Sequence, residues 1–203
     1  KYAYPGSASC CKDSDDTLCQ FASEHSHYTL IDVPGSARKL NKTVKGMALC
    51  DAGIFIVSVS DDEIDRETMD KDDSLRLLIA RSMGVKRLVV FVNKVDLRSD
   101  YVYLKKVENH VRNKLERFGF DSVSTPVIFG SAKKALYDSD HQYGKESIIK
   151  LIKKMDWCFN PISKELKTYR SDSFRLTISY VDSLIGEAEG VIASGVLEVG
   201  DTV

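Results

Sequence analysis

The sequence lacks the features of several classes of protein. No apolar run approaches the roughly 20 residues of a membrane-spanning helix, and no signal peptide is visible. The five cysteines are odd in number and contain no CxxC pair, so we expect neither a zinc site nor a disulfide framework. These absences favour an intracellular protein with reduced thiols and no membrane span.

An excess of charge of one sign is also lacking. The 29 basic and 30 acidic residues give a net charge of -1, so no overall field favours nucleic acid. Basic side chains do gather in one predicted helix, and we interpret them as its solvated face: Lys105, Lys106, Arg112, Lys114 and Arg117. The length allows one α/β domain and part of a second.

Strands and helices alternate through most of the chain. Apolar, β-rich runs predict a hairpin over 19–31 and strands over 53–59, 87–92 and 126–129. Helical spacing of apolar residues predicts helices over 38–49, 74–83, 103–118 and 146–157. The alternation indicates an α/β domain over residues 1–159, with a mainly parallel sheet and flanking helices.

The pattern changes in the last part of the chain. Residues 160–173 are polar without periodicity, which we interpret as a linker. Residues 174–181 then alternate with period two, and another β-rich run covers 190–197 with no helix between them. We therefore expect residues 174–203 to begin an all-β domain.

The most informative motif is Asn93-Lys94-Val95-Asp96, which follows a predicted buried strand. Ligands of open α/β sheets bind at the carboxyl ends of the strands. The Asp96 carboxylate can accept two hydrogen bonds from the N1 and amino donors of guanine, a pair that adenine lacks. Asn93 can hold the loop or reach the base, and the stem of Lys94 can lie along the ring.

Two weaker motifs follow other predicted strands. In Asp32-Val33-Pro34-Gly35, the carboxylate can hold a water on Mg²⁺ and the Gly35 amide can donate to a terminal phosphate. Taken alone, this Pro-Gly pair is ordinary turn chemistry. In Gly130-Ser131-Ala132-Lys133, the Ser131 and Ala132 amides can bond guanine O6, although the motif alone could be a simple loop.

The three motifs, in this order, resemble the GTPase superfamily, and the residues between them resemble elongation factor Tu and elongation factor 1-alpha. The similarity includes Lys45-Gly46-Met47, the run 77–85 and the stretch 125–136, which looks closest to bacterial and organellar members. It extends to 190–203, which resemble the opening of the family's β-barrel domain. The resemblance implies a P-loop-GTPase-like fold, with GTP/GDP and Mg²⁺ as ligands. The binding residues that it implies are Asp32, Gly35, Asn93, Lys94, Asp96, Ser131, Ala132 and Lys133.

The sequence departs from this family at two places. Ser36 stands where the family has the His that positions the attacking water, and serine lacks a near-neutral imidazole. We therefore expect slow or absent GTP hydrolysis. No GxxxxGK[ST] phosphate loop is present, and the partial match over 6–13 has Cys11 and Asp13 at key positions. We interpret it as a chance match, and we expect either a longer protein or a degenerate relative.

The resemblance predicts a guanine-nucleotide-binding translation-factor-like protein that acts with the ribosome or aminoacyl-tRNA. The first alternative is a GTPase-like structural or assembly subunit without turnover, bound to protein partners. A second alternative is the GTPase subunit of a metabolic enzyme, similar to the sulfate-activating relatives. The residues Ala193-Ser194-Gly195 are compatible with this alternative. The bacterial-like stretch 126–136 favours a mitochondrial or other organellar matrix, with the cytoplasm as the alternative.

Overall fold

The computed structural model describes residues 18–23, 26–35, 39–59, 67–137, 141–169 and 174–202. The chain divides into two compact units, Lys1–Asn160 and Pro161–Val203, which are described separately. No helix among the described ranges is long and apolar enough to cross a membrane.

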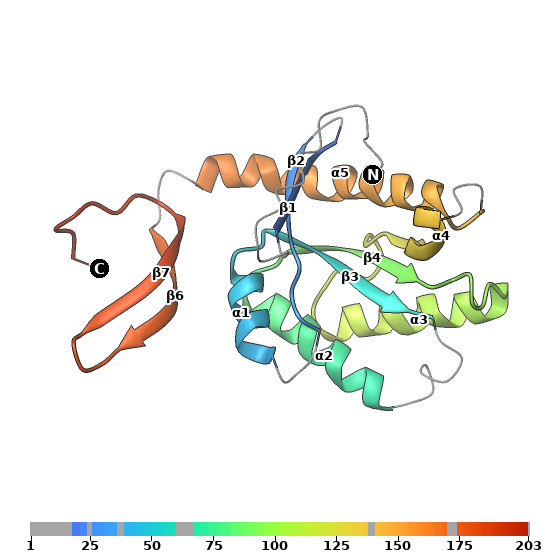
Figure 1. Ribbon diagram of the computed structural model, residues 1–203, viewed down its shortest axis with the longest axis horizontal. Helices are drawn as coiled ribbons and strands as arrows, with labels where there is room; N and C mark the ends of the chain where they lie inside the picture. The colour runs from blue at the N-terminus through green and yellow to red at the C-terminus, as the bar shows by residue number, and fades with distance from the viewer. Residues whose placement is uncertain are drawn as a thin grey trace. The chain divides into compact units, whose positions relative to one another are not determined.

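A three-stranded parallel sheet forms the centre of the first unit (Figure 1). Its strands are β3 (Ala52–Ser58), β4 (Arg87–Asn93) and β5 (Val127–Phe129), in the order β3-β4-β5. The middle strand is the most apolar, and both of its faces are buried because helices cover both sides of the sheet. All three strands therefore end at the same edge.

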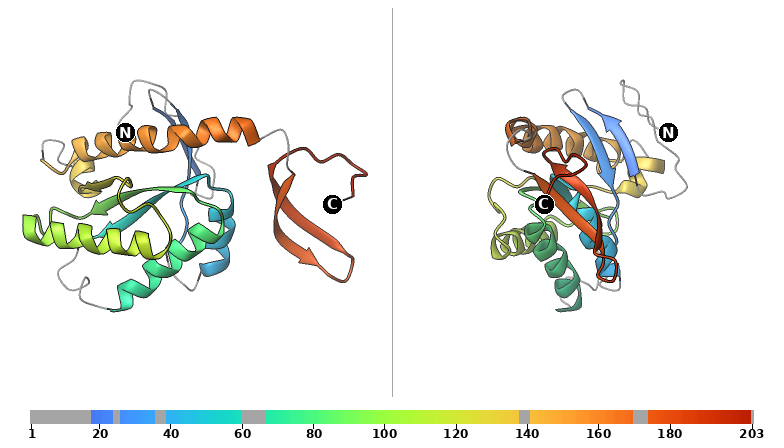
Figure 2. Two further views of the ribbon diagram at one scale, coloured as in Figure 1. Left: turned by 180° about the vertical axis from the view of Figure 1, so that it is seen from behind. Right: turned by 90° about the vertical axis from the view of Figure 1, so that its left-hand side faces the viewer.

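Helices cover the two faces of this sheet, as both Figure 1 and Figure 2 show. On one face lie α2 (Glu67–Ser82) and α3 (Tyr101–Arg117), whose apolar residues pack with those of β3 and β4. This core includes Phe55, Val57, Val90, Val92, Leu77, Val107, Val111 and Leu115. On the other face lies α5 (Lys145–Tyr169), where the Cys158 thiol is 3.6 Å from the Leu88 carbonyl oxygen.

An antiparallel hairpin precedes the sheet and is bound to α5. It consists of β1 (Leu18–Ala22) and β2 (His27–Ile31). The buried carboxylate of Asp156 accepts hydrogen bonds from Ser23 Oγ at 2.6 Å and from Tyr28 Oη at 2.8 Å. These two bonds attach the hairpin to α5, and its second strand leads into the Asp32 loop.

The second unit contains a small antiparallel sheet. Its strands are β6 (Arg175–Asp182) and β7 (Glu187–Ser194), and Gly186 in the connecting turn has a φ of 73° that suits glycine. This all-β pairing agrees with the alternating pattern of the sequence. Whether it begins a barrel stays a prediction.

The α/β class and its parallel sheet are confirmed, but three helices differ from expectation. The structure starts α2 at Glu67, ahead of the predicted start of this helix at residue 74. It adds a short α4 (Ala132–Tyr137) that was not predicted. It also continues α5 to Tyr169, through most of the expected linker 160–173, because Lys-Glu-Leu-Lys after Pro161 consists of good helix formers.

Candidate functional site

The loops after β4 and β5 are joined by the side chain of Asn93. Its Oδ1 accepts a hydrogen bond from the Lys94 amide at 2.8 Å and another from the Ala132 amide at 2.9 Å. Backbone bonds add to this connection, since the amide of Val95 donates to the Gly130 carbonyl at 3.2 Å. Two motifs that are far apart in sequence therefore form one structural unit at the edge where the strands end.

The turn after Asn93 carries two charged side chains, Lys94 and Asp96, on a backbone that is held in place by hydrogen bonds and by a buried residue. Lys94 has a φ of 63°, a left-handed conformation that is uncommon for a residue with a side chain. Val95 is fully buried and anchors the turn, while the Leu97 amide closes it by donating to the Lys94 carbonyl. Lys94 is exposed, and the half-buried carboxylate of Asp96 has no hydrogen-bond partner among the described residues. This carboxylate is thus open to a ligand with two donors.

The second loop depends on a close approach at Gly130. A Cβ at this position would lie 2.3 Å from Ser147 Oγ and 2.7 Å from Phe91 Cζ. The next residue, Ser131, is fully buried, and its Oγ accepts a hydrogen bond from the Lys134 amide at 3.1 Å. Ser131 therefore caps the first turn of α4, and the exposed Lys133 follows it.

The amides of Ser131 and Ala132 already have acceptors within the protein. The Ser131 amide donates to the Tyr143 carbonyl at 2.8 Å, and the Ala132 amide donates to Asn93. We expected both amides to bond a guanine O6. Both amides are therefore already paired within the protein, whereas the Asp96 carboxylate has no hydrogen-bond partner among the described residues.

The Asp32–Gly35 loop follows β2 and is held from the side of α1 (Leu40–Ala48). Thr43 Oγ1 donates to the Pro34 carbonyl at 2.7 Å. A Cβ at Gly46 would lie 2.4 Å from Val33 Cγ1, so the helix packs closely on the loop. The side chain of Asp32 is exposed, as is Gly35. The predicted residue Ser36 lies outside the described residues.

The structure thus joins two of the three motifs directly and supports the third separately. No hydrogen bond among the described residues connects Asp32–Gly35 to either of the loops after β4 and β5. The third loop instead has a neighbour that the sequence did not reveal. A Cβ on Gly35 would lie 3.1 Å from Nη1 of Arg76, a residue of α2 for which no motif gives a signal.

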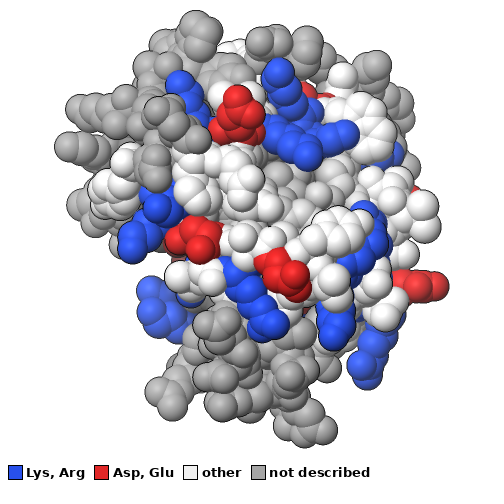
Figure 3. Space-filling view, turned by 90° about the vertical axis from the view of Figure 1, so that its right-hand side faces the viewer, with Lys and Arg blue, Asp and Glu red and all other residues white. Residues whose placement is uncertain are grey.

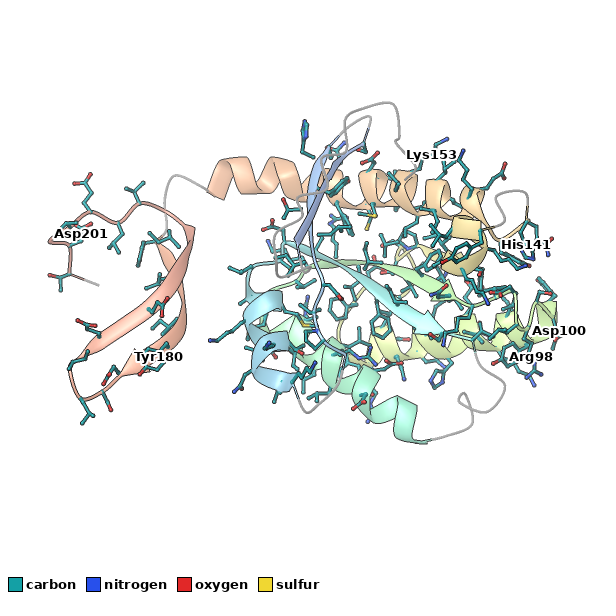
Figure 4. The ribbon with its side chains drawn as sticks, viewed as in Figure 1. Arg98, Asp100, His141, Lys153, Tyr180 and Asp201 are labelled. Atoms are coloured by element: carbon teal, nitrogen blue, oxygen red, sulfur yellow. The ribbon has the colours of Figure 1, made fainter. Side chains whose placement is uncertain are left out.

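Charged and aromatic groups surround the edge where the strands end. Figure 3 looks onto the molecule from this side, and lysine and arginine side chains stand around a mainly uncharged area with a few acidic groups between them. Arg98 lies over the ring of Tyr103 at 3.7 Å, and Asp100 caps α3 by accepting from the Tyr103 amide at 2.9 Å (Figure 4). The N-terminus of α3, which follows the Asp96 turn, is therefore stabilised by a side-chain cap.

The exposed carboxylate of Asp32 is the predicted contact for a magnesium ion, and its surroundings can be compared with the ligands that this ion prefers. Within the described ranges, no three His, Cys, Asp or Glu side chains gather in a way that could hold a metal ion. Mg²⁺ usually keeps several waters and takes one or two carboxylates together with substrate phosphates. A single exposed carboxylate at Asp32 fits this mode, and it does not fit a metal enclosed entirely by protein ligands.

Most of these features lie in a part of the chain that matches a known protein family. Residues 14–161 match the family described as the Elongation factor Tu GTP binding domain. The match extends over more than half of the chain and includes the Asp32–Gly35 loop, the two loops joined by Asn93, and the sheet between them.

Proposed function

The chain belongs to the family of the Elongation factor Tu GTP binding domain, and from this premise we propose how and to what end it binds its nucleotide. Membership makes it a GTP-binding, translation-factor-like protein. We propose that the guanine base binds at the loops after β4 and β5, where Asp96 accepts from N1 and the exocyclic amine. The observation that supports this most is the Asn93 bridge, which fixes the Asp96 turn against the second loop.

The phosphates would then extend toward the Asp32–Gly35 loop. Gly35 would donate its amide to a terminal phosphate oxygen, and Asp32 would hold a water of Mg²⁺. When bound, Mg²⁺ would supply positive charge to neutralise the phosphate oxygens. The close packing of α1 on Val33 and the bond from Thr43 to Pro34 support a loop whose position depends on α1.

We further propose that hydrolysis is slow or absent and that nucleotide binding serves as a structural signal. The support is chemical: Ser36 has no imidazole to orient or activate water. The nucleotide-bound protein would act with the ribosome or aminoacyl-tRNA, as members of this family do. Its proposed compartment is an organellar matrix or the cytoplasm.

Calorimetry with GTP, GDP and ATP in the presence of Mg²⁺ tests the binding proposal. We expect both guanine nucleotides to bind and ATP to bind at least tenfold more weakly, because only guanine offers Asp96 two donors. The Asp96→Asn variant should lose this preference, and Asp100→Asn, whose side chain caps α3, is the control. Absence of guanine binding would leave the alternative of a structural subunit that keeps the fold alone.

A single-turnover hydrolysis assay tests the role of Ser36. We expect little phosphate release from GTP by the wild type and faster release by the Ser36→His variant. Phosphate release by the wild type that is clearly faster than uncatalysed hydrolysis and at least as fast as by the variant would contradict the proposed lack of turnover, and it would leave the binding proposal untouched.

A further inference from the structure

The guanidinium group of Arg76 lies against Gly35, the residue whose amide is proposed to meet a terminal phosphate. Measured from a Cβ built on Gly35, Nη1 is 3.1 Å away, Cζ is 3.5 Å away and Nε is 4.0 Å away. The Nη1 end of the guanidinium group is therefore the part that lies nearest to Gly35. A positively charged group thus lies beside the proposed phosphate contact.

Helix α2 holds the guanidinium group in one orientation. Nη2 is paired with Asp73 Oδ1 at 2.6 Å, and Nε donates to the Asp72 carbonyl at 3.2 Å. Nη1, the nitrogen nearest Gly35, has no acceptor among the described residues. Two nitrogens thus fix the group to its helix, and the third turns its donors toward the loop.

Asp73 is itself fixed by a second cation. It is only 3% exposed, and its Oδ2 lies 3.6 Å from Nζ of Lys114, a buried residue of α3. Two cations from two helices therefore contact one carboxylate, which holds Arg76 in place beside Gly35. Because the three groups come from two packed helices, the charge facing Gly35 is preorganised and needs little rearrangement when an anion arrives.

We propose that Arg76 is a phosphate-binding residue, which uses Nη1 to bind the terminal phosphate of a nucleoside triphosphate beside the Gly35 amide. The inference rests on the proposed function of this loop. Hydrogen bonds from guanidinium to phosphate are charge-assisted and roughly twice as strong as neutral ones. A diphosphate has no group at this position, so Arg76 favours GTP over GDP and hardly affects the binding of the base.

The test compares dissociation constants of a non-hydrolysable GTP analogue and of GDP, with Mg²⁺, for the full chain and three variants. Arg76→Gln removes the charge, and we expect it to lower the preference for the triphosphate about tenfold with little change in GDP affinity. Arg76→Lys should restore part of that preference, because a cation remains. The control is Arg81→Gln on the same helix, where the guanidinium lies 5.7 Å from the ring of Phe120 and should not affect nucleotides.

The outcomes separate this inference from the proposed function. If wild type and Arg76→Gln bind both nucleotides with the same triphosphate preference, the inference is wrong and the proposed nucleotide site stands. If the wild type binds neither nucleotide, both fail. Thermal unfolding of each variant checks the fold, and an Arg76→Lys variant that folds normally but behaves like Arg76→Gln would also contradict a role based on charge alone.

Discussion

The Oδ1 atom of Asn93 lies 2.9 Å from the backbone nitrogen of Ala132, which is 39 residues further along the chain. Through this bond, one side chain at the end of β4 sets the distance between two loops. The same oxygen also accepts from the Lys94 amide, so it fixes the turn that presents Asp96. Asn93 thus joins the two loops through its side-chain oxygen, and a contact from its side chain to the base stays a prediction.

Replacing Asn93 with Ala removes both of these hydrogen bonds. We expect a loss of about 1–2 kcal/mol of folding stability, because two backbone amides lose their acceptor. We also expect at least tenfold weaker binding of GDP, since the Asp96 turn and the second loop no longer hold one another. Urea unfolding and calorimetry would measure the two effects.

The matched control is Asn113→Ala, which removes an exposed asparagine from α3. It should change stability by less than about 0.5 kcal/mol and leave GDP binding as it is. A result in which Asn93→Ala binds GDP as tightly as the control would show that the loops keep their geometry without the bridge.

The buried carboxylate of Asp73 should contribute strongly to stability. Asp73→Ala leaves Lys114 buried without this partner and releases Arg76, so we expect a loss of about 3 kcal/mol in urea unfolding. Adding Lys114→Met should recover much of that loss, because an apolar side chain replaces a buried charge that has lost its Asp73 partner. Equal stability of the single and the double variant would contradict this account.

The control for this pair is Glu108→Ala on α3. Glu108 binds Lys105 and Arg112, but both cations are partly exposed, and surface ion pairs contribute at most about 1 kcal/mol. A greater loss for Glu108→Ala than for Asp73→Ala would show that burial does not decide the strength of these pairs.

The bond between Tyr28 and Asp156 predicts a dependence of stability on alkaline pH. Burial, and next the Asp156 carboxylate, raise the pKa of Tyr28 above its ordinary value of 10.0. The folded protein therefore holds this proton more tightly than the unfolded chain does. The resulting stability is fully present below the unfolded pKa and is lost as pH rises above it.

Urea unfolding from neutral pH to about pH 11 would measure this effect in wild type and Tyr28→Phe. The stability difference between the two proteins should be greatest near neutral pH and should shrink above pH 10, the ordinary tyrosine pKa. Tyr180→Phe, at an exposed tyrosine, should show no such trend. A wild-type advantage that is constant across this range would rule out the titration of Tyr28 as its source.

The sequence allowed the strands and the two joined motifs to be predicted, for a simple physical reason. A strand buried on both faces, such as β4, must be apolar throughout, and polar residues after it mark the edge of the sheet. The motifs at Asn93 and Gly130 stand at such points. Their joining could be inferred because parallel neighbours end at the same edge.

Other features could not be predicted because their cause lies in tertiary contacts. Ser131 starts α4 only because its side chain is buried and turned toward the Lys134 amide. No motif in the sequence includes Arg76, and only the packing of α2 beside Gly35 distinguishes it. The continuation of α5 was missed because polar residues without apolar spacing give no periodic signal, although they form helices well.

The most direct test of the central claim, that Asp96 reads a guanine base, is an exchange of base preference. We would measure the affinities of wild type and Asp96→Asn for GDP and for xanthosine diphosphate, in which a carbonyl oxygen replaces the amino donor. We expect the variant to bind GDP at least tenfold more weakly and the xanthosine nucleotide more tightly, because an amide can donate where the carboxylate only accepts. Unchanged affinity of the variant for both nucleotides would contradict the claim.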